Sequence, residues 1–288
     1  MKQRTIALFV FAAVALTLTG RVALTAGLAA AQVEARRTVY FSAVDDQGAP
    51  VKDLTAADLT VKEGGKERRI VGIQPATAPM QVAIFVDDAG TGAFQTAVAQ
   101  FFDATQGHAE YSVSIMNPQP IRVANYTADY GALRTAIGRL GQRGRVLVDG
   151  EQIIEAVGGA AKELQQLRAK RPVIVVLTVG GEKPLSDIAD AALDNLQSSG
   201  ASLHVLYVTG NVLGKVLGDG PKLSGGTIQQ ASPGVQLGPV LGKIADSLMH
   251  QYLLGYTLPE GVKPSDKLSL TTSRKGVKIV APTRLPDK

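Results

Sequence analysis

The 288-residue chain contains no cysteine and only three histidines. The absence of cysteine excludes disulfides, a thiol nucleophile, thiolate metal sites and a lipid-modified cysteine. His108, His204 and His250 are scattered along the sequence, and none has a serine and an acidic residue at a spacing that suggests a catalytic triad. Nothing in these residues points to catalysis, so we expect a protein that is not an enzyme.

Nucleotide-binding motifs are also missing. The chain has no phosphate-binding loop of the Gly-x-x-x-x-Gly-Lys-Ser/Thr type. Gly90 and Gly92 could open a dinucleotide-binding fingerprint, but Gln95 occupies the position of its third glycine. No clear candidate for the ribose-binding acid follows the motif. We therefore expect no nucleotide cofactor.

The net charge of +5 comes partly from one end of the chain. Residues 1–31 contain three basic residues, Lys2, Arg4 and Arg21, and no acidic one. The rest of the chain carries 27 basic and 25 acidic residues, a net charge of +2. Such a mixed surface gives no support to nucleic-acid binding.

Residues 1–31 have the layout of a secretory signal peptide. "MKQRTIALFVFAAVALTLTG" is a charged start followed by an apolar run, and Ala29 and Ala31 are the small residues of a cleavage site after Ala31. The alternative is an uncleaved membrane anchor, interrupted only by Arg21. No later segment has the ~18 consecutive apolar residues of a membrane span. We expect an exported protein, periplasmic or extracellular, that is tethered to the membrane only if residues 1–31 are retained.

Short strands dominate both ends of the remaining chain. Residues 32–77 alternate apolar and polar side chains, and Gly64 and Gly65 mark a hairpin. Residues 258–288 again have the pattern of strands. Neither region has enough strands to be stable alone, so we expect the C-terminal strands to pack with the N-terminal β module.

Residues 78–257 alternate between apolar strands and helical patterns. "VAIFVD" (82–87) and "PVIVVLTV" (172–179) are apolar almost throughout, as expected for central strands covered on both faces. "PIRVANY" (120–126) follows the strand before it so closely that it should pair antiparallel at an edge, whereas "LGDGPKLSGG" (217–226) predicts a flexible loop. The alternation predicts an α/β fold with a doubly wound, parallel-rich sheet and helices on both faces.

Several weak motifs occur in one fixed order along the chain. They are "VDDQGAPVKDLTAADLTVKEGGKERRI", a strand ending in "VDD", "SGGTIQQA" followed by "IADSLMHQYLLGYTLPEG", and the closing "KLSLTTSRKGVKIVAP". Together they resemble the exported von Willebrand factor A-related proteins of bacteria such as the acidobacteria, over nearly all of the chain after residue 31. The resemblance implies a von Willebrand factor A-like domain with an N-terminal β module. It also implies a binding role, often through a divalent metal ion that accepts a carboxylate from a protein partner.

The same resemblance implies where the ligands of such a metal should lie. The family loop Asp-x-Ser-x-Ser corresponds to Asp87, Asp88, Ala89, Gly90 and Thr91. Asp87 matches the family aspartate, and Thr91 keeps a hydroxyl in place of the second serine. Ala89 cannot replace the first serine, because a methyl group offers no lone pair.

The other two ligand loops depart further from the family pattern. Arg145 stands where the second loop should carry a threonine, and its permanent positive charge would repel a metal ion. Val179 stands where the third loop should carry an aspartate, next to Gly180. With three of five ligand positions lost, we expect no metal cofactor. Magnesium or calcium stays open as the alternative, with Asp88 or Asp149 as further ligands.

Arg145 has two open interpretations. Its guanidinium either neutralises Asp87 and Asp88 in place of the ion or points into solvent.

The leading hypothesis for function is a non-enzymatic protein-binding or adhesion-type domain of the bacterial envelope that acts without metal. Its contact loops would lie at the carboxyl ends of the strands, around Asp87, Asp88, Thr91, Arg145 and Gly180. The alternatives are a divalent-metal-dependent adhesin and a structural or assembly component of the envelope.

Overall fold

The computed structural model describes residues 34–116, 119–141, 150–183, 186–208, 210 and 213–286. All of them belong to one compact unit, Val33–Lys288. The expected signal segment, Arg145 and the alternative ligand Asp149 lie outside the described residues. None of the helices in the described part of the chain has the length and apolar content needed to traverse a bilayer.

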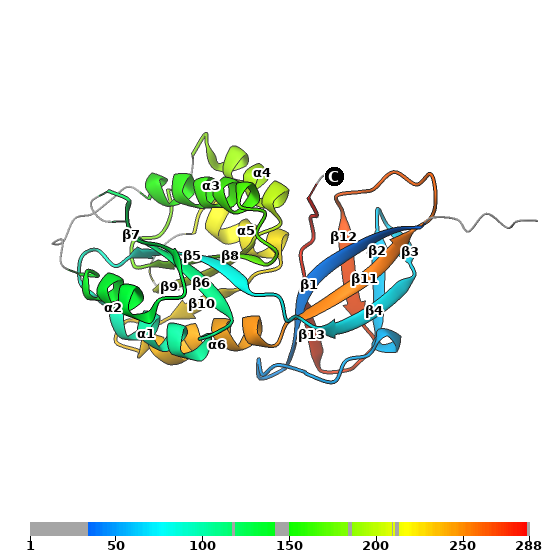
Figure 1. Ribbon diagram of the computed structural model, residues 1–288, viewed down its shortest axis with the longest axis horizontal. Helices are drawn as coiled ribbons and strands as arrows, with labels where there is room; N and C mark the ends of the chain where they lie inside the picture. The colour runs from blue at the N-terminus through cyan, green and yellow to red at the C-terminus, as the bar shows by residue number, and fades with distance from the viewer. Residues whose placement is uncertain are drawn as a thin grey trace, which may run out of the picture. The chain divides into compact units, whose positions relative to one another are not determined.

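A six-stranded sheet forms the centre of the α/β region among the described residues (Figure 1). In spatial order its strands are β10 (Ile228–Ala231), β9 (Ser202–Val208), β8 (Pro172–Thr178), β5 (Met80–Asp87), β6 (Ala109–Ile115) and β7 (Ile121–Thr127). All neighbours pair in parallel except β7, which pairs antiparallel with β6 as expected. Every residue of β8 is buried, because this apolar, β-branched strand is covered on both faces.

Helices cover both faces of this sheet (Figure 1). One face carries α1 (Gln95–Ala104), α2 (Tyr130–Gly138) and α6 (Leu237–Met249), and the other carries α3 (Glu151–Gln166), α4 (Ala189–Ser199) and α5 (Lys215–Ser224). From β5 the chain builds outward to β6 and β7 on one side and later to β8, β9 and β10 on the other. Open α/β sheets bind ligands at such a switch point, beyond the carboxyl ends of the strands.

The prediction of a flexible loop at 217–226 is wrong. Most of this stretch belongs to α5, although Gly218, Gly220 and Pro221 all disfavour a helix. Tertiary packing overrides these propensities, because Val216 and Leu217 are fully buried in the core beneath the helix.

The β module combines strands from both ends of the described chain. One antiparallel sheet has the order β13 (Val277–Val280), β1 (Ala35–Asp45), β11 (Tyr252–Leu258) and β4 (Ile70–Pro75). The other has the order β12 (Leu268–Thr272), β2 (Leu59–Glu63) and β3 (Lys66–Arg68), and the short 3-10 helix η1 (Ala56–Asp58) precedes β2. The C-terminal strands thus pair with N-terminal ones, β13 with β1 and β12 with β2. The expected fold class is confirmed.

Strand β11 belongs to the β module, although the expected domain boundary after residue 257 separates most of it from that module. Residues 252–257 were expected within the α/β region, but they pair with β1 and β4. Alternate side chains of β11 are buried in the β-module core, where the ring of Tyr252 stacks on that of Phe41 at 5.2 Å. An apolar strand near a boundary is compatible with either sheet, and only the long-range pairing decides between them.

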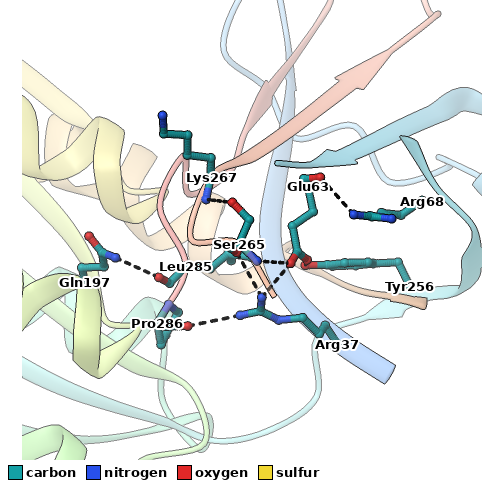
Figure 2. Close-up of polar contacts among 9 residues, drawn as sticks. All are labelled: Arg37, Glu63, Arg68, Gln197, Tyr256, Ser265, Lys267, Leu285 and Pro286. Atoms are coloured by element: carbon teal, nitrogen blue, oxygen red, sulfur yellow. Dashed lines mark hydrogen bonds and ion pairs between the residues drawn. The ribbon is translucent and has the colours of Figure 1, made fainter. Parts of the chain in front are cut away.

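A buried ion pair ties distant segments of the β module together (Figure 2). Arg37 Nη1 lies 3.0 Å from Glu63 Oε1, and the Tyr256 hydroxyl donates to Glu63 Oε2 at 2.6 Å. The Ser265 amide donates to Glu63 Oε1 at 2.8 Å, and Arg37 Nη2 donates to the Pro286 carbonyl at 3.2 Å. Burial and the Glu63 carboxylate raise the pKa of Tyr256, so its hydroxyl remains a donor. The network connects β1, β2 and β11 with the C-terminal segment.

Candidate functional site

Asp87 is the last residue of β5 and is held inside the protein. Its side chain lies opposite Thr178 at the end of β8, and the Thr178 hydroxyl donates to Asp87 Oδ2 at 2.7 Å. Both residues are buried. The Val179 amide donates to the Asp87 carbonyl at 2.9 Å, which fixes the turn after β8 against the end of β5.

Gly180 completes this contact because it has no side chain. A Cβ atom at this position would lie 2.8 Å from Asp87 Oδ2, closer than such contacts normally occur. The amides of Gly180 and Gly181 donate to the Thr178 hydroxyl at 3.0 and 2.8 Å. The structure therefore brings Asp87 and Gly180 together, as expected, and adds Thr178, which the sequence analysis missed.

Asp88 fills the loop that follows β5. Its side chain is fully buried, Oδ1 accepts the Gly90 amide at 2.9 Å, and Oδ2 accepts the Gly92 amide at 2.8 Å. Ala89, Gly90 and Gly92 all have positive φ angles, so the chain curls its amides around the carboxylate. The Asp88 carboxylate therefore occupies the concave set of loop amides that could otherwise bind an anion from outside.

Thr91 is turned toward the backbone of the same loop. Its hydroxyl donates to the Asp88 carbonyl at 2.7 Å and accepts the Ala93 amide at 3.3 Å. The residue is exposed, but its oxygen makes no described contact with Asp87. The structure thus places Thr91 beside Asp88 rather than in a shared ligand shell with Asp87.

Among the residues that the structure describes, the oxygen donors around Asp87 do not fit magnesium or calcium, which take about six oxygen ligands or more. Ala89 and Val179 offer no side-chain lone pair, and Asp88 and Thr91 direct their oxygens to the loop backbone. Within the described residues, no group of three or more histidine or acidic side chains is arranged to hold a metal ion. The proposed ion pair of Arg145 with Asp87 or Asp88 stays a prediction, because Arg145 lies outside the described residues.

Glu182 anchors the loop after β8 and was also missed by the sequence analysis. Its buried carboxylate accepts the amides of Val216 at 2.9 Å and Leu217 at 2.6 Å, at the first turn of α5. Burial raises the pKa of Glu182, while these amides act in the opposite direction. Lys183 Nζ lies 2.9 Å from Glu151 Oε2 at the start of α3. Two helices therefore hold the third loop.

A groove of about 650 Å3 opens beside this loop cluster, and we call it the edge groove. It is lined by Ala93, by residues 96, 97 and 100 of α1, by Val179 directly after β8, by Val208 at the end of β9, and by residues 232–239 before and within α6. Its described lining contains no charged side chain. Val179 connects the groove directly to the Asp87 turn.

Comparison with known proteins gives a likeness only at the level of structure. No family model matches the sequence, and no curated protein is similar to it. The structure is similar to that of a von Willebrand factor type A protein from Catenulispora acidiphila, with a TM-score of 0.51 over 90% of this chain and 75% of that chain. The chain has a von Willebrand factor A-like fold. The sequence identity is 11%, so the likeness to this neighbour concerns the fold alone.

Further solved structures cover a smaller share of this chain. The vWF domain of the type V pili tip protein Mfa5 from Porphyromonas gingivalis matches with a TM-score of 0.43 and 13% identity, over 60% of this chain and 96% of that chain. An aerotolerance-related membrane protein from Bacteroides fragilis matches with a TM-score of 0.42 and 14% identity, over 59% of this chain and 98% of that chain. At this level of similarity, neither neighbour informs the function of this chain.

Proposed function

We propose that this chain is a non-enzymatic protein-binding domain of the bacterial envelope that acts without a metal ion and without another cofactor. The observation that carries this proposal is that the carboxylates of Asp87 and Asp88, at the switch point, already accept hydrogen bonds from the protein. The Thr178 hydroxyl donates to Asp87, and the amides of Gly90 and Gly92 donate to the two carboxylate oxygens of Asp88. A metal ion would have to break these contacts and would gain few oxygen ligands in return.

The edge groove supplies the contact surface in this proposal. It lies at the carboxyl ends of the strands, where such sheets bind ligands, and it combines amide and hydroxyl groups with apolar side chains. Val235 in its wall is 50% exposed, so its side chain is accessible to a partner in the groove. A neutral groove of this kind suits an apolar, hydrogen-bonding segment of a protein partner.

Thermal unfolding of the full chain tests the metal-free part of the proposal. We expect the same melting temperature in chelator and in millimolar magnesium, calcium or manganese. A specific rise with one ion, abolished in Asp87→Asn, would instead favour the divalent-metal-dependent adhesin.

Site-directed photo-crosslinking tests the binding role. A benzophenone amino acid replaces Val235 in the edge groove or, as the matched control, Leu167 after α3, which is 49% exposed. In an envelope extract of the source organism with chelator present, we expect one discrete protein adduct at position 235 and none at position 167. Adducts at neither position, with Ala93 and Thr96 also negative, would favour a structural component that binds no ligand at this end of the sheet.

A further inference from the structure

A second groove, of about 670 Å3, lies at the amino end of β10. Its walls come from the end of α5, the start of β10, α6 and β13. It therefore lies between the von Willebrand factor A-like domain (the A-like domain) and the β module. It shares no lining residue with the edge groove. We call it the lysine groove.

Three lysines give this groove its charge. Lys222 lies in the last turn of α5, Lys243 lies on α6 and Lys278 lies on β13, and all three are exposed. No acidic residue belongs to the described lining. None of the three lysines is ion-paired within the described part of the chain. Like charges converging on a concave surface repel each other and attract an anionic partner.

The backbone and the apolar lining favour an extended peptide as that partner. β10 and β13 are edge strands of their sheets among the described strands, and each has four residues, about 13 Å of extended chain. Ile228 on β10 is 40% exposed, and Ile279 on β13 also lines the groove. Edge strands can pair with an added segment, and alternate side chains of that segment would face the groove.

We propose that the lysine groove binds an extended acidic segment of another protein. Carboxylates of the segment pair with Lys222, Lys243 and Lys278, and its apolar side chains contact Ile228 and Ile279. The chain's own residues 1–31 do not fit as the occupant, because they carry three basic residues and no acidic one. A flat anionic membrane fits less well than a peptide, because the groove is concave and is bordered by strand edges.

The test uses the full chain and a fluorescein-labelled peptide of nine residues in which glutamate alternates with leucine. We expect saturable binding by fluorescence anisotropy that weakens as the salt concentration rises. The triple variant Lys222→Glu, Lys243→Glu and Lys278→Glu should bind at least about tenfold more weakly, because three attractive contacts become repulsive.

The control has the same change of charge at exposed lysines outside the groove. Lys62→Glu, Lys162→Glu and Lys263→Glu should together leave the affinity within about twofold of wild type, since distant surface charges are screened. Equal losses in the two triple variants would overturn the proposal, because binding would then depend on net charge alone. Circular dichroism checks that both variants are folded.

Two further probes separate an acidic peptide from other polyanions. A peptide with lysine in place of each glutamate should not bind. Dextran sulfate and phosphatidylglycerol vesicles should bind the groove variant and the charge-matched control variant about equally if they bind at all. Binding of either polyanion that needs the three groove lysines, together with no binding of the glutamate peptide, would overturn the proposal in favour of a polysaccharide or a membrane surface.

Discussion

Asp88 shows at the scale of one residue how the first loop differs from a metal site. Its carboxylate accepts two amides of its own loop, which are only half-buried. Asp88→Ala should lower the free energy of unfolding by about 1–3 kcal/mol, because both amides lose their acceptor and water replaces it incompletely. Urea unfolding measures this loss, with Asp103→Ala, an exposed acid on α1, as the control. Equal stabilities of the two variants would contradict this role of Asp88.

His204 makes the stability of the fold depend on pH. Burial, aided by repulsion from Arg171, lowers the pKa of His204 to about 3, so the folded protein keeps the ring neutral. The unfolded chain takes up this proton as the pH falls below about 6.5, and the folded chain does so only near pH 3. The contribution of His204 to the free energy of unfolding therefore falls by about 1.4 kcal/mol per pH unit within this window.

Urea unfolding of the wild type and of His204→Gln at pH 7, 6 and 5 isolates this effect from other titrating groups. The advantage of the wild type should narrow as the pH falls, because glutamine does not titrate. A difference between the two proteins that stays constant over this range would show that His204 is protonated in the folded state as readily as in the unfolded state.

At the scale of elements, α5 depends on a contact from outside the helix. Glu182 accepts the amides of Val216 and Leu217, both buried, at the end where a helix has unpaired donors. Glu182→Ala should lower the free energy of unfolding by about 2 kcal/mol or more and speed hydrogen exchange in α5 without affecting α3. Asp219→Ala, at an exposed position on the same helix, is the control. Unchanged exchange in α5 would contradict this dependence.

The elements also show where sequence patterns succeed and fail. The central strands β5 and β8 were predictable because continuous apolar, β-branched runs are a local signal. Helix α5 was not predictable, because Glu182 and the core beneath the helix outweigh its glycines and proline. Thr178 was missed for a similar reason, since its partner Asp87 lies 91 residues away in the sequence. The one local signal for Thr178 is a polar residue that ends an apolar strand just before two glycines.

At the scale of the whole molecule, the Arg37–Glu63 pair of β1 and β2 also binds Tyr256 and the Pro286 carbonyl from the C-terminal part of the chain (Figure 2). Arg37→Met should lower the free energy of unfolding by about 3–5 kcal/mol, because it leaves the fully buried Glu63 carboxylate without its cation. Adding Glu63→Gln removes that charge and keeps one acceptor for Tyr256. The double variant should therefore recover stability relative to Arg37→Met in urea unfolding. A double variant less stable than Arg37→Met would mean that the pair matters for packing rather than for charge.

The sequence by itself determined which kinds of chemistry the chain lacks the residues for, and it determined the fold class. The absence of cysteine excludes thiol chemistry, and Ala89 and Val179 cannot ligate a metal ion in any conformation of their side chains. Apolar periodicity is local, so it was enough to predict a parallel-rich sheet covered by helices. Only the tertiary structure decided that β11 joins the β module, that Asp88 occupies its own loop and that two separate grooves flank the A-like domain. The strand pairing and the grooves depend on contacts between elements that are far apart in the sequence, and the position of Asp88 depends on the positive φ angles of its loop, which the backbone adopts only in the folded protein.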